Sequence, residues 1–231
     1  QEITADGQTV FTDIPYSDMF QNPIYQWWAG FGINVADGQT ATNWEDGLAG
    51  INASAVGSPT YRADQSGFEA VEYNGTNEGH NWSGNANLPT GDETWAFAAL
   101  GWLKSGSGIH NVVGWGDTDL DGRYIALRFQ DGQVGVEISG IVVPKTGSNL
   151  EGSWVTIGGR YDQSNVTPYA NGSPGTGASV SSLNVQAENE SLGYRRTLND
   201  FFGDLYLAEV IVCADAESDQ AFSNYHSNRL D

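Results

Sequence analysis

Three aspartates at alternate positions form the densest group of potential metal ligands in this sequence. Asp117, Asp119 and Asp121 stand directly before Gly122, so a tight turn would bring three carboxylates close together. Hard carboxylate oxygens around a turn suit calcium. The run begins like a helix–loop–helix calcium motif, but its twelfth position is Arg128 in place of a bidentate glutamate. Two interpretations stay open: a calcium site, or an acidic hairpin turn that needs no metal.

A second group of residue types suits carbohydrate. Proteins commonly hold small ligands between aromatic ring faces and a few planar polar side chains. Trp82 and Trp115 neighbour glycine-rich turns, which predicts that they are exposed in loops. Tyr194 and Arg195 add a ring and a cation, although a polar turn between strands is the alternative interpretation of this pair. These four residues are the candidate ligand-binding set, whereas the alternating pattern around Trp102 favours packing.

The sequence contains no complete set of catalytic residues. Retaining glycoside hydrolysis needs two carboxylates about 5 Å apart, usually on one face of a strand. Glu69 and Glu72 are three positions apart and would point to opposite faces, and Asp204 and Glu209 have the same defect. The histidines, candidates for a lyase base, are scattered: His80, His110 and His226. We therefore expect no catalytic residues, and a glycan hydrolase or lyase is the least favoured alternative.

Short apolar runs separated by turn residues indicate the elements that would position these side chains. Such spacing predicts an all-β fold, a two-sheet antiparallel β-sandwich of the jelly-roll type. A helical spacing of apolar residues near the end predicts one short C-terminal helix over 217–229. Asn171-Gly172 predicts a hairpin turn with positive φ angles. The main predicted strands span 94–103, 109–115, 123–129, 133–138, 154–161, 166–170 and 202–212.

The charge balance excludes several classes of partner. There are 29 acidic residues and 9 basic ones, a formal net charge of −20. Such a surface repels phosphate backbones and anionic lipid, so we expect neither nucleic-acid binding nor membrane insertion. Abundant Asp and Glu with two lysines indicates a protein adapted to high salt, an ordinary acidic secreted protein being the alternative. Cys213, in an apolar run, is expected to be a buried thiol.

The order of several motifs resembles the laminin-G-like jelly-roll domains of the concanavalin-A-like superfamily. The motifs are an Asn-Trp-Glu-Asp opening at 43–46, a strand ending in Asn74-Gly75, a Trp154 strand with a Tyr-Ala-Asn-Gly hairpin at 169–172, and a closing strand at 202–210. The resemblance covers about 22–231 and implies one sandwich domain. It also implies that Trp44 and Trp154 pack in the core, and it raises the expectation of calcium.

Residues 1–21 are expected to form an N-terminal arm, with an edge strand of the same sandwich as the alternative. A strand-like run followed by a proline, around Val10, Phe11 and Pro15, resembles the opening of phage tail-fibre and virion proteins. That resemblance implies contacts with other virion proteins through 1–21, and a homo-oligomer formed through the same segment. Six Asn-x-Ser/Thr acceptor sites favour an extracellular or virion-surface location.

These observations favour a non-catalytic recognition or adhesion domain that binds glycan or another cell-surface ligand. A structural virion decoration, turret or fibre component, with the sandwich as an outward knob, is the second hypothesis. The two roles are compatible in one protein.

Overall fold

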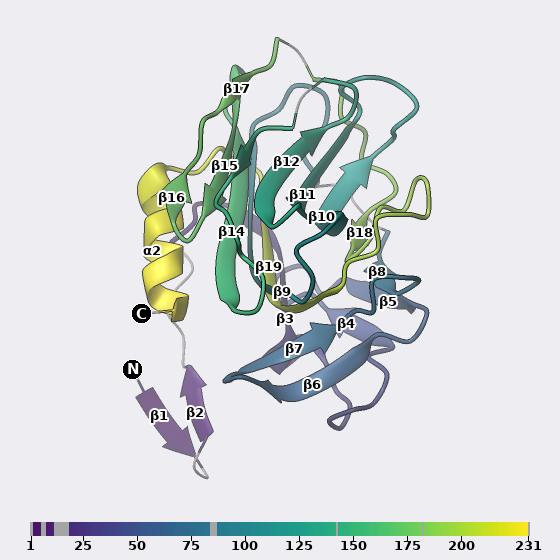
Figure 1. The fold of residues 1–231 in the computed structure, drawn as a ribbon, viewed down its shortest axis with the longest axis vertical. Helices are drawn as coiled ribbons and strands as arrows, with labels where there is room; N and C mark the ends of the chain where they lie inside the picture. Colours follow the sequence, from purple (N-terminus) through teal and green to yellow (C-terminus); the bar gives the residue numbers. More distant parts are fainter. Residues whose placement is uncertain are drawn as a thin grey trace.

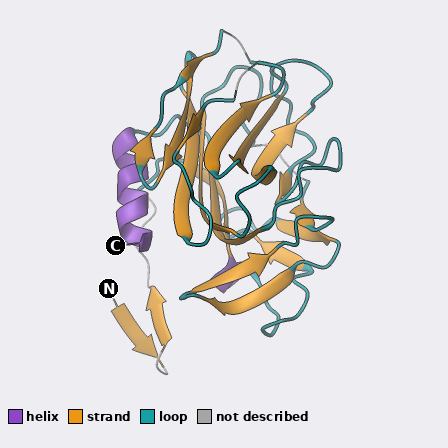
Figure 2. Cartoon of the chain, in the orientation of Figure 1, coloured by secondary structure: helices purple, strands orange, loops and turns teal. Residues whose placement is uncertain are grey.

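Short apolar and alternating runs form two large antiparallel sheets in this chain. The computed structural model describes residues 2–5, 8–11, 19–83, 87–141, 143–181 and 183–230. Every ladder between the named strands of these ranges is antiparallel. The sheets face one another in a sandwich (Figures 1 and 2). The predicted fold class is confirmed.

The first sheet, here called the β11 sheet, is built mainly from the middle of the chain. Within the described residues it has eight strands, in spatial order β13 (Lys145–Thr146), β12 (Gln133–Ile138), β11 (Tyr124–Gln130), β10 (Ile109–Gly116), β18 (Ser191–Leu192), β8 (Gly79–Asn81), β5 (Asn52–Val56) and β4 (Asn43–Glu45).

The second sheet, here called the β9 sheet, carries the longest strands. Its path across the described residues is β16 (Ser173–Pro174), β15 (Asn165–Ala170), β14 (Trp154–Tyr161), β9 (Trp95–Leu103), β19 (Leu205–Cys213), β7 (Phe68–Glu72) and β6 (Thr60–Gln65), while β17 (Ala178–Ser179) pairs with β15 and β3 (Pro23–Trp28) pairs with β19. Two strands share the edge of β19 that faces away from β9: β7 pairs with the first half of β19, and β3 pairs with its second half.

The sandwich core lies between the two sheets and is rich in aromatic rings. Phe97 of β9 meets Trp115 of β10 edge to face across the interior, with ring centroids 5.8 Å apart. Trp44 is fully buried, as predicted. Cys213 is also buried and free, which confirms its predicted burial. Burial of so many large side chains is the main stabilising contribution to such a domain.

One helix covers part of the outer face of the β9 sheet. This helix, α2 (Asp219–Leu230), confirms the predicted C-terminal helix, and it lies beside β14, β15 and β16 (Figure 1). Phe222 of α2 stacks on Tyr169 with ring centroids 3.8 Å apart. The shorter α1 (Ala29–Gly32) follows β3. Neither helix has the length and apolar content to cross a bilayer, within the described part of the chain.

The N-terminal segment forms a small sheet of its own. Strands β1 (Glu2–Ala5) and β2 (Gln8–Phe11) pair with each other, and in the described ranges neither belongs to the two large sheets. Met19 and Phe20, at the end of the predicted arm, are buried together with α2 residues. The division at residue 21 stays a prediction, because 12–18 lie outside the described residues.

Candidate functional site

Aromatic side chains line up across three neighbouring strands, β14, β9 and β19, on the outer face of the β9 sheet. In the strand registers Trp154 of β14 is opposite Trp102 of β9, and Trp102 is opposite Tyr206 of β19. Directly opposed residues share one face of a sheet, so these rings form a cross-strand row. Leu103 and Leu205, the chain neighbours of Trp102 and Tyr206, point into the core and are fully buried. The row therefore lies on the outer face, where all three rings are partly exposed.

A fourth ring extends this row, which we name the aromatic row (Phe68, Trp154, Trp102 and Tyr206). Ring centroids are 5.1 Å apart for Phe68 and Trp154, 5.9 Å for Trp154 and Trp102, and 6.5 Å for Trp102 and Tyr206. Trp154 is held by a 2.8 Å hydrogen bond from its indole Nε1 to the backbone oxygen of Gln65. Trp154, Trp102 and Tyr206 stand on three adjacent strands spaced over about 10 Å, and Phe68 contacts Trp154 from β7, so the row is long enough for a short oligosaccharide.

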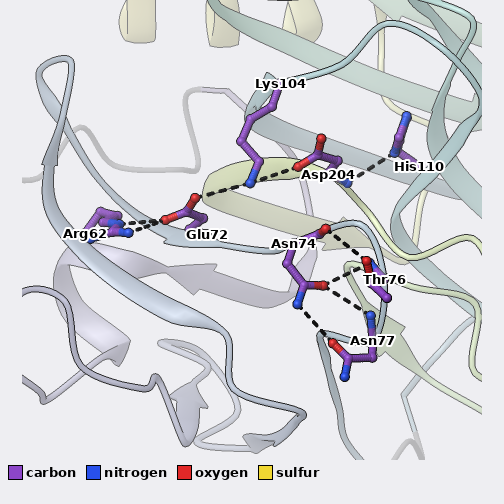
Figure 3. Close-up of polar contacts among 8 residues, drawn as sticks. All are labelled: Arg62, Glu72, Asn74, Thr76, Asn77, Lys104, His110 and Asp204. Carbon is purple, nitrogen blue, oxygen red and sulfur yellow. Dashed lines mark hydrogen bonds and ion pairs between the residues drawn. The ribbon is translucent and has the colours of Figure 1, made fainter.

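A group of ion pairs centred on Glu72 and Lys104 lies beside Tyr206, and Figure 3 shows these pairs. Glu72 of β7 is the cross-strand partner of Tyr206. Its carboxylate accepts hydrogen bonds from Arg62 Nε at 2.7 Å and from Lys104 Nζ at 3.2 Å. Lys104 also pairs with Asp204 at 2.9 Å, and its Nζ lies 5.2 Å from the centre of the Tyr206 ring. We name Arg62, Glu72, Lys104 and Asp204 the charged edge.

Arg62, Glu72 and Lys104 of this edge favour one another's ionised forms. Burial alone would raise the pKa of Glu72, but the hydrogen bonds and charges of Arg62 and Lys104 outweigh it and lower that pKa overall. Burial would conversely lower the pKa of Lys104, yet Asp204 and Glu72 raise it. The pKa of Tyr206 is raised, first by burial and then by the nearby charge of Glu72. The edge thus presents fixed donors and acceptors beside the rings.

The neighbouring turn adds exposed amide and hydroxyl groups (Figure 3). The Asn74 side-chain oxygen accepts from the backbone N–H groups of Thr76 and Asn77, and its Nδ2 donates to Asn77 Oδ1 at 2.9 Å. On the other side, the backbone N–H of Asp204 donates to His110 Nδ1 at 3.1 Å. These contacts fix the loops that carry the charged edge.

The expected exposure of two tryptophans is wrong. Trp82 is 2% exposed and Trp115 is 0% exposed. Trp82 packs against Trp27 with centroids 4.5 Å apart, and Trp115 donates its indole N–H to the carbonyl of Pro89 at 3.2 Å. Trp115 lies within β10 and Trp82 directly follows β8, and in both places the side chain points inward despite the flanking glycines. In this conformation neither ring presents a face to a ligand.

Tyr194 and Arg195 lie in a closed turn. Tyr194 is buried, stacked on Phe202 with centroids 5.2 Å apart and planes 4° apart. Arg195 donates from Nε to Asp200 at 2.7 Å, and its guanidinium lies 3.9 Å from the centre of the Phe201 ring. These contacts match the alternative of a polar turn, and the assignment of this pair to a ligand stays a prediction.

The three aspartates of the calcium prediction lie in the connection from β10 to β11. Asp119 and Asp121 are exposed, and the backbone N–H of Asp119 bonds to Asp117 Oδ1 at 3.0 Å in a local turn. Across the described residues, no three His, Cys, Asp or Glu side chains gather into a metal-binding group. Calcium at Asp117, Asp119 and Asp121 therefore stays a prediction from sequence.

The sequence interpretation missed the aromatic row because it assigned Trp102 and Trp154 to packing. Their strands alternate as predicted, but alternation does not tell which face is covered. Helix α2 covers only the part of the β9 sheet near Ala96, Ala98 and Ile211. The correction is that Trp102 and Trp154 are partly exposed on the part of the sheet that α2 does not cover. The row becomes visible only when the strand pairing places Trp154, Trp102 and Tyr206 opposite one another, so the local sequence offered no signal for it.

A cleft of about 630 Å³ opens where β9 begins and β19 ends, at the ends of these strands that lie away from the aromatic row. The described residues that line it are Asn87, Leu88, Pro89, Thr90, Glu93, Thr94, Gln163, Ala187, Ala214 and Asp215. This lining contains no aromatic ring, so the cleft lacks the platform on which a sugar ring could stack. The aromatic row is accordingly the better candidate for carbohydrate.

No family model matches this chain, and no curated protein matches it. Among solved structures, domain 4 of AbnA, an extracellular arabinanase from Geobacillus stearothermophilus in complex with arabinotriose, is 14% identical over 88% of this chain and 97% of that one, with a TM-score of 0.65. CBM40 of the Ruminococcus gnavus IT-sialidase, bound to α2,3-sialyllactose, is 14% identical over 67% of this chain and 96% of that one, with a TM-score of 0.54.

A third similar structure is a much longer protein. A mutant of Trypanosoma rangeli sialidase that displays trans-sialidase activity is 13% identical over 87% of this chain, with a TM-score of 0.62, and the match spans 32% of the sialidase chain. Identities this low show the fold alone. The resemblances to laminin-G domains and to tail fibres stay predictions. The chain has a two-sheet antiparallel β-sandwich fold, compatible with the predicted jelly roll.

Proposed function

We propose that this chain is a non-catalytic glycan-binding domain and that its ligand lies along the aromatic row. The observation that carries the proposal is the partly exposed series Trp154, Trp102 and Tyr206, opposed in register on adjacent strands. Sugar rings present apolar C–H faces that stack on such rings, while their hydroxyls need donors and acceptors at the side. Arg62, Glu72 and Lys104 supply those groups next to Tyr206.

The solved neighbours support the same class of ligand. One of them is a domain in complex with arabinotriose, and another is bound to sialyllactose. The rigidity of the site adds to this support, since the rings are borne by strands in the middle of a sheet and not by loops. A preformed site loses little conformational entropy when it binds.

The protonation of the charged edge favours binding over hydrolysis. A glycosidase needs a carboxylic acid that keeps its proton near neutral pH, and burial or a like charge usually raises its pKa. Glu72 has the opposite environment, because Arg62 and Lys104 lower its pKa. Glu72 is therefore unsuited to donate a proton to a leaving group.

Substitution of the central rings tests the proposal. Trp102→Ala and Trp154→Ala should each weaken binding to a glycan-array hit about ten-fold or more, because each removes a stacking face worth about 0.5–1.5 kcal/mol beyond its area burial. Phe31→Ala is the control, since this ring is 69% exposed and makes no ring contact with the aromatic row. Circular dichroism and thermal melting show whether each variant folds.

The outcome is decisive in both directions. Binding by isothermal titration that is lost in the two tryptophan variants and kept in Phe31→Ala supports the site. Unchanged affinity in folded Trp102→Ala and Trp154→Ala would place the ligand elsewhere. A protein that binds nothing on the array would remove the proposed function.

A further inference from the structure

We infer that the aromatic row takes neutral saccharides and discriminates against saccharides that carry carboxylates. This inference rests on the proposed function and concerns the specificity of the same site. Recognition of a sugar carboxylate ordinarily uses a cation free to form a charge-assisted, often bidentate, pair. The cations beside the row are Arg62 and Lys104, and both are already engaged by protein carboxylates.

The pairing of Arg62 uses the groups that an anionic sugar would need. Its Nε and Nη2 both contact Glu72 Oε2, at 2.7 and 2.6 Å, so one side of the guanidinium is committed. The Arg62 side chain is nevertheless 40% exposed, and Nη1 is not part of that pair. Nη1 can therefore donate to a sugar hydroxyl, a neutral acceptor, without disturbing the ion pair.

Lys104 is committed on two sides. Its Nζ lies 3.2 Å from Glu72 Oε1 and 2.9 Å from Asp204 Oδ1. A sugar carboxylate at this place would approach two protein carboxylates together with one ammonium, so repulsion would offset the attraction. Displacing either partner would leave a partly buried charge unpaired, which is costly.

Further carboxylates act on the same cations. Asp37 interacts electrostatically with Arg62, and Glu78 interacts with Lys104 and Glu72. Around the edge, two cations thus face four carboxylates: Glu72, Asp204, Asp37 and Glu78. The net charge of −20 adds a long-range field that repels anionic ligands before contact. Local and global charges therefore act in the same direction.

Matched saccharide pairs test the inference directly. Galactotriose and trigalacturonate have the same ring stereochemistry and differ in the carboxylates, and lactose and 3′-sialyllactose differ by one acidic residue. Tryptophan fluorescence and isothermal titration at 150 mM NaCl measure both members of each pair. We expect the neutral member to bind at least ten-fold more tightly in every pair that binds.

Glu72→Gln provides a gain-of-function test. Neutralising Glu72 releases Arg62 and removes one of the two carboxylates that hold Lys104. The ratio of acidic to neutral affinity should then rise about ten-fold, the effect of one new charge-assisted contact. Glu45→Gln is the matched control, because it removes the same unit charge from an exposed position on β4, in the other sheet, and should leave the ratio unchanged.

Each outcome has a distinct meaning. Tighter binding of the acidic members by the unmodified protein, lost in Arg62→Ala, would overturn the inference and keep the proposed function. A ratio unchanged in folded Glu72→Gln would also overturn it. Absence of binding by all four probes and by a wider glycan array would remove the proposed function, and the inference with it.

Discussion

Glu217 is a buried carboxyl next to the start of α2. Its side chain is 5% exposed, and its Oε1 has no hydrogen-bond partner in the described structure. Burial, and after it the charge of Asp215, raises the pKa of Glu217 to about 7. The backbone of Gln21 and the thiol of Cys213 hydrogen-bond to the carboxyl and limit this rise. An unfolded glutamate titrates near 4.3, so the folded state holds the proton over a wider pH range.

This difference predicts that stability falls with rising pH. Between about pH 4.5 and 7 the folded state binds more protons than the unfolded state, so the free energy of unfolding decreases through this window and is lowest above it. Glu217→Gln, which cannot ionise, should be more stable than the unmodified protein at pH 8 by on the order of 2 kcal/mol. The two proteins should converge near pH 4. Urea unfolding at both pH values measures the difference.

A control separates this effect from the loss of one negative charge. Glu188→Gln neutralises an exposed carboxylate and should show no such pH-dependent gain. If Glu217→Gln is equally stabilised at pH 4 and pH 8, or is destabilised at pH 8, ionisation of this group does not limit stability.

The tryptophans show how much of the structure around a single residue can be predicted from the sequence. The alternation of Trp102 with Leu103 predicts that they lie on opposite faces, and the structure has them so. Whether the Trp102 face is covered depends on where a helix more than a hundred residues later lands on the sheet. Trp82 was misjudged for a related reason, since Trp27, which buries it, comes from a distant strand. The local sequence pattern predicts on which face of the sheet a side chain lies, but it does not predict whether another element covers that face.

At the scale of elements, α2 depends on a glycine in the strand beneath it. A Cβ at Gly158 of β14 would lie 2.5 Å from the Phe222 ring and 3.0 Å from the backbone oxygen of Phe97. Real Cβ atoms do not approach other atoms so closely, so the missing side chain permits the Phe222–Tyr169 stack. The Phe222 ring of α2 therefore packs directly over Gly158, in the space that a side chain at this position would fill.

Gly158→Ala should loosen this docking. Phe222 or the backbone must shift, and overpacking of this kind typically costs about 1–3 kcal/mol. Gly47→Ala is the matched control, because its Cβ would meet its nearest neighbour at 3.7 Å, an ordinary contact. Thermal melting and hydrogen exchange of α2 amides measure the effect. Equal stability of the two alanine variants would show that the helix does not rely on this close approach.

The elements themselves were largely predictable. The strands expected at 133–138 and 154–161 match β12 and β14, and the Asn171-Gly172 turn has φ angles of 48° and 72°. Strong alternation and turn residues determine such elements locally. Pairing across the sheet is different: β19 lies beside β9, a hundred residues earlier. The aromatic row depends on that pairing, so it could not be read from the local pattern.

The charge of the whole molecule leads to a prediction about salt. With 29 acidic and 9 basic residues, the folded chain carries repulsion that an expanded chain relieves. Salt shortens the screening distance from about 10 Å at 0.1 M to about 3 Å at 1 M. We expect the melting temperature to rise by ~5 °C between 0.1 M and 2 M NaCl, equivalent to about 1–2 kcal/mol for a chain of this size.

A charge-reduced variant distinguishes screening from a general effect of salt on apolar burial. Glu45→Gln, Asp119→Asn and Glu188→Gln together remove three exposed negative charges outside the aromatic row. If repulsion limits stability, this variant should melt higher than the unmodified protein at 0.1 M NaCl and gain less from added salt. If salt acts by strengthening apolar burial, the melting temperatures of both proteins should rise in parallel, because their buried surfaces are the same. A flat or falling melting temperature in the unmodified protein would contradict adaptation to high salt, and the acidic surface would then serve another purpose, such as excluding anionic ligands.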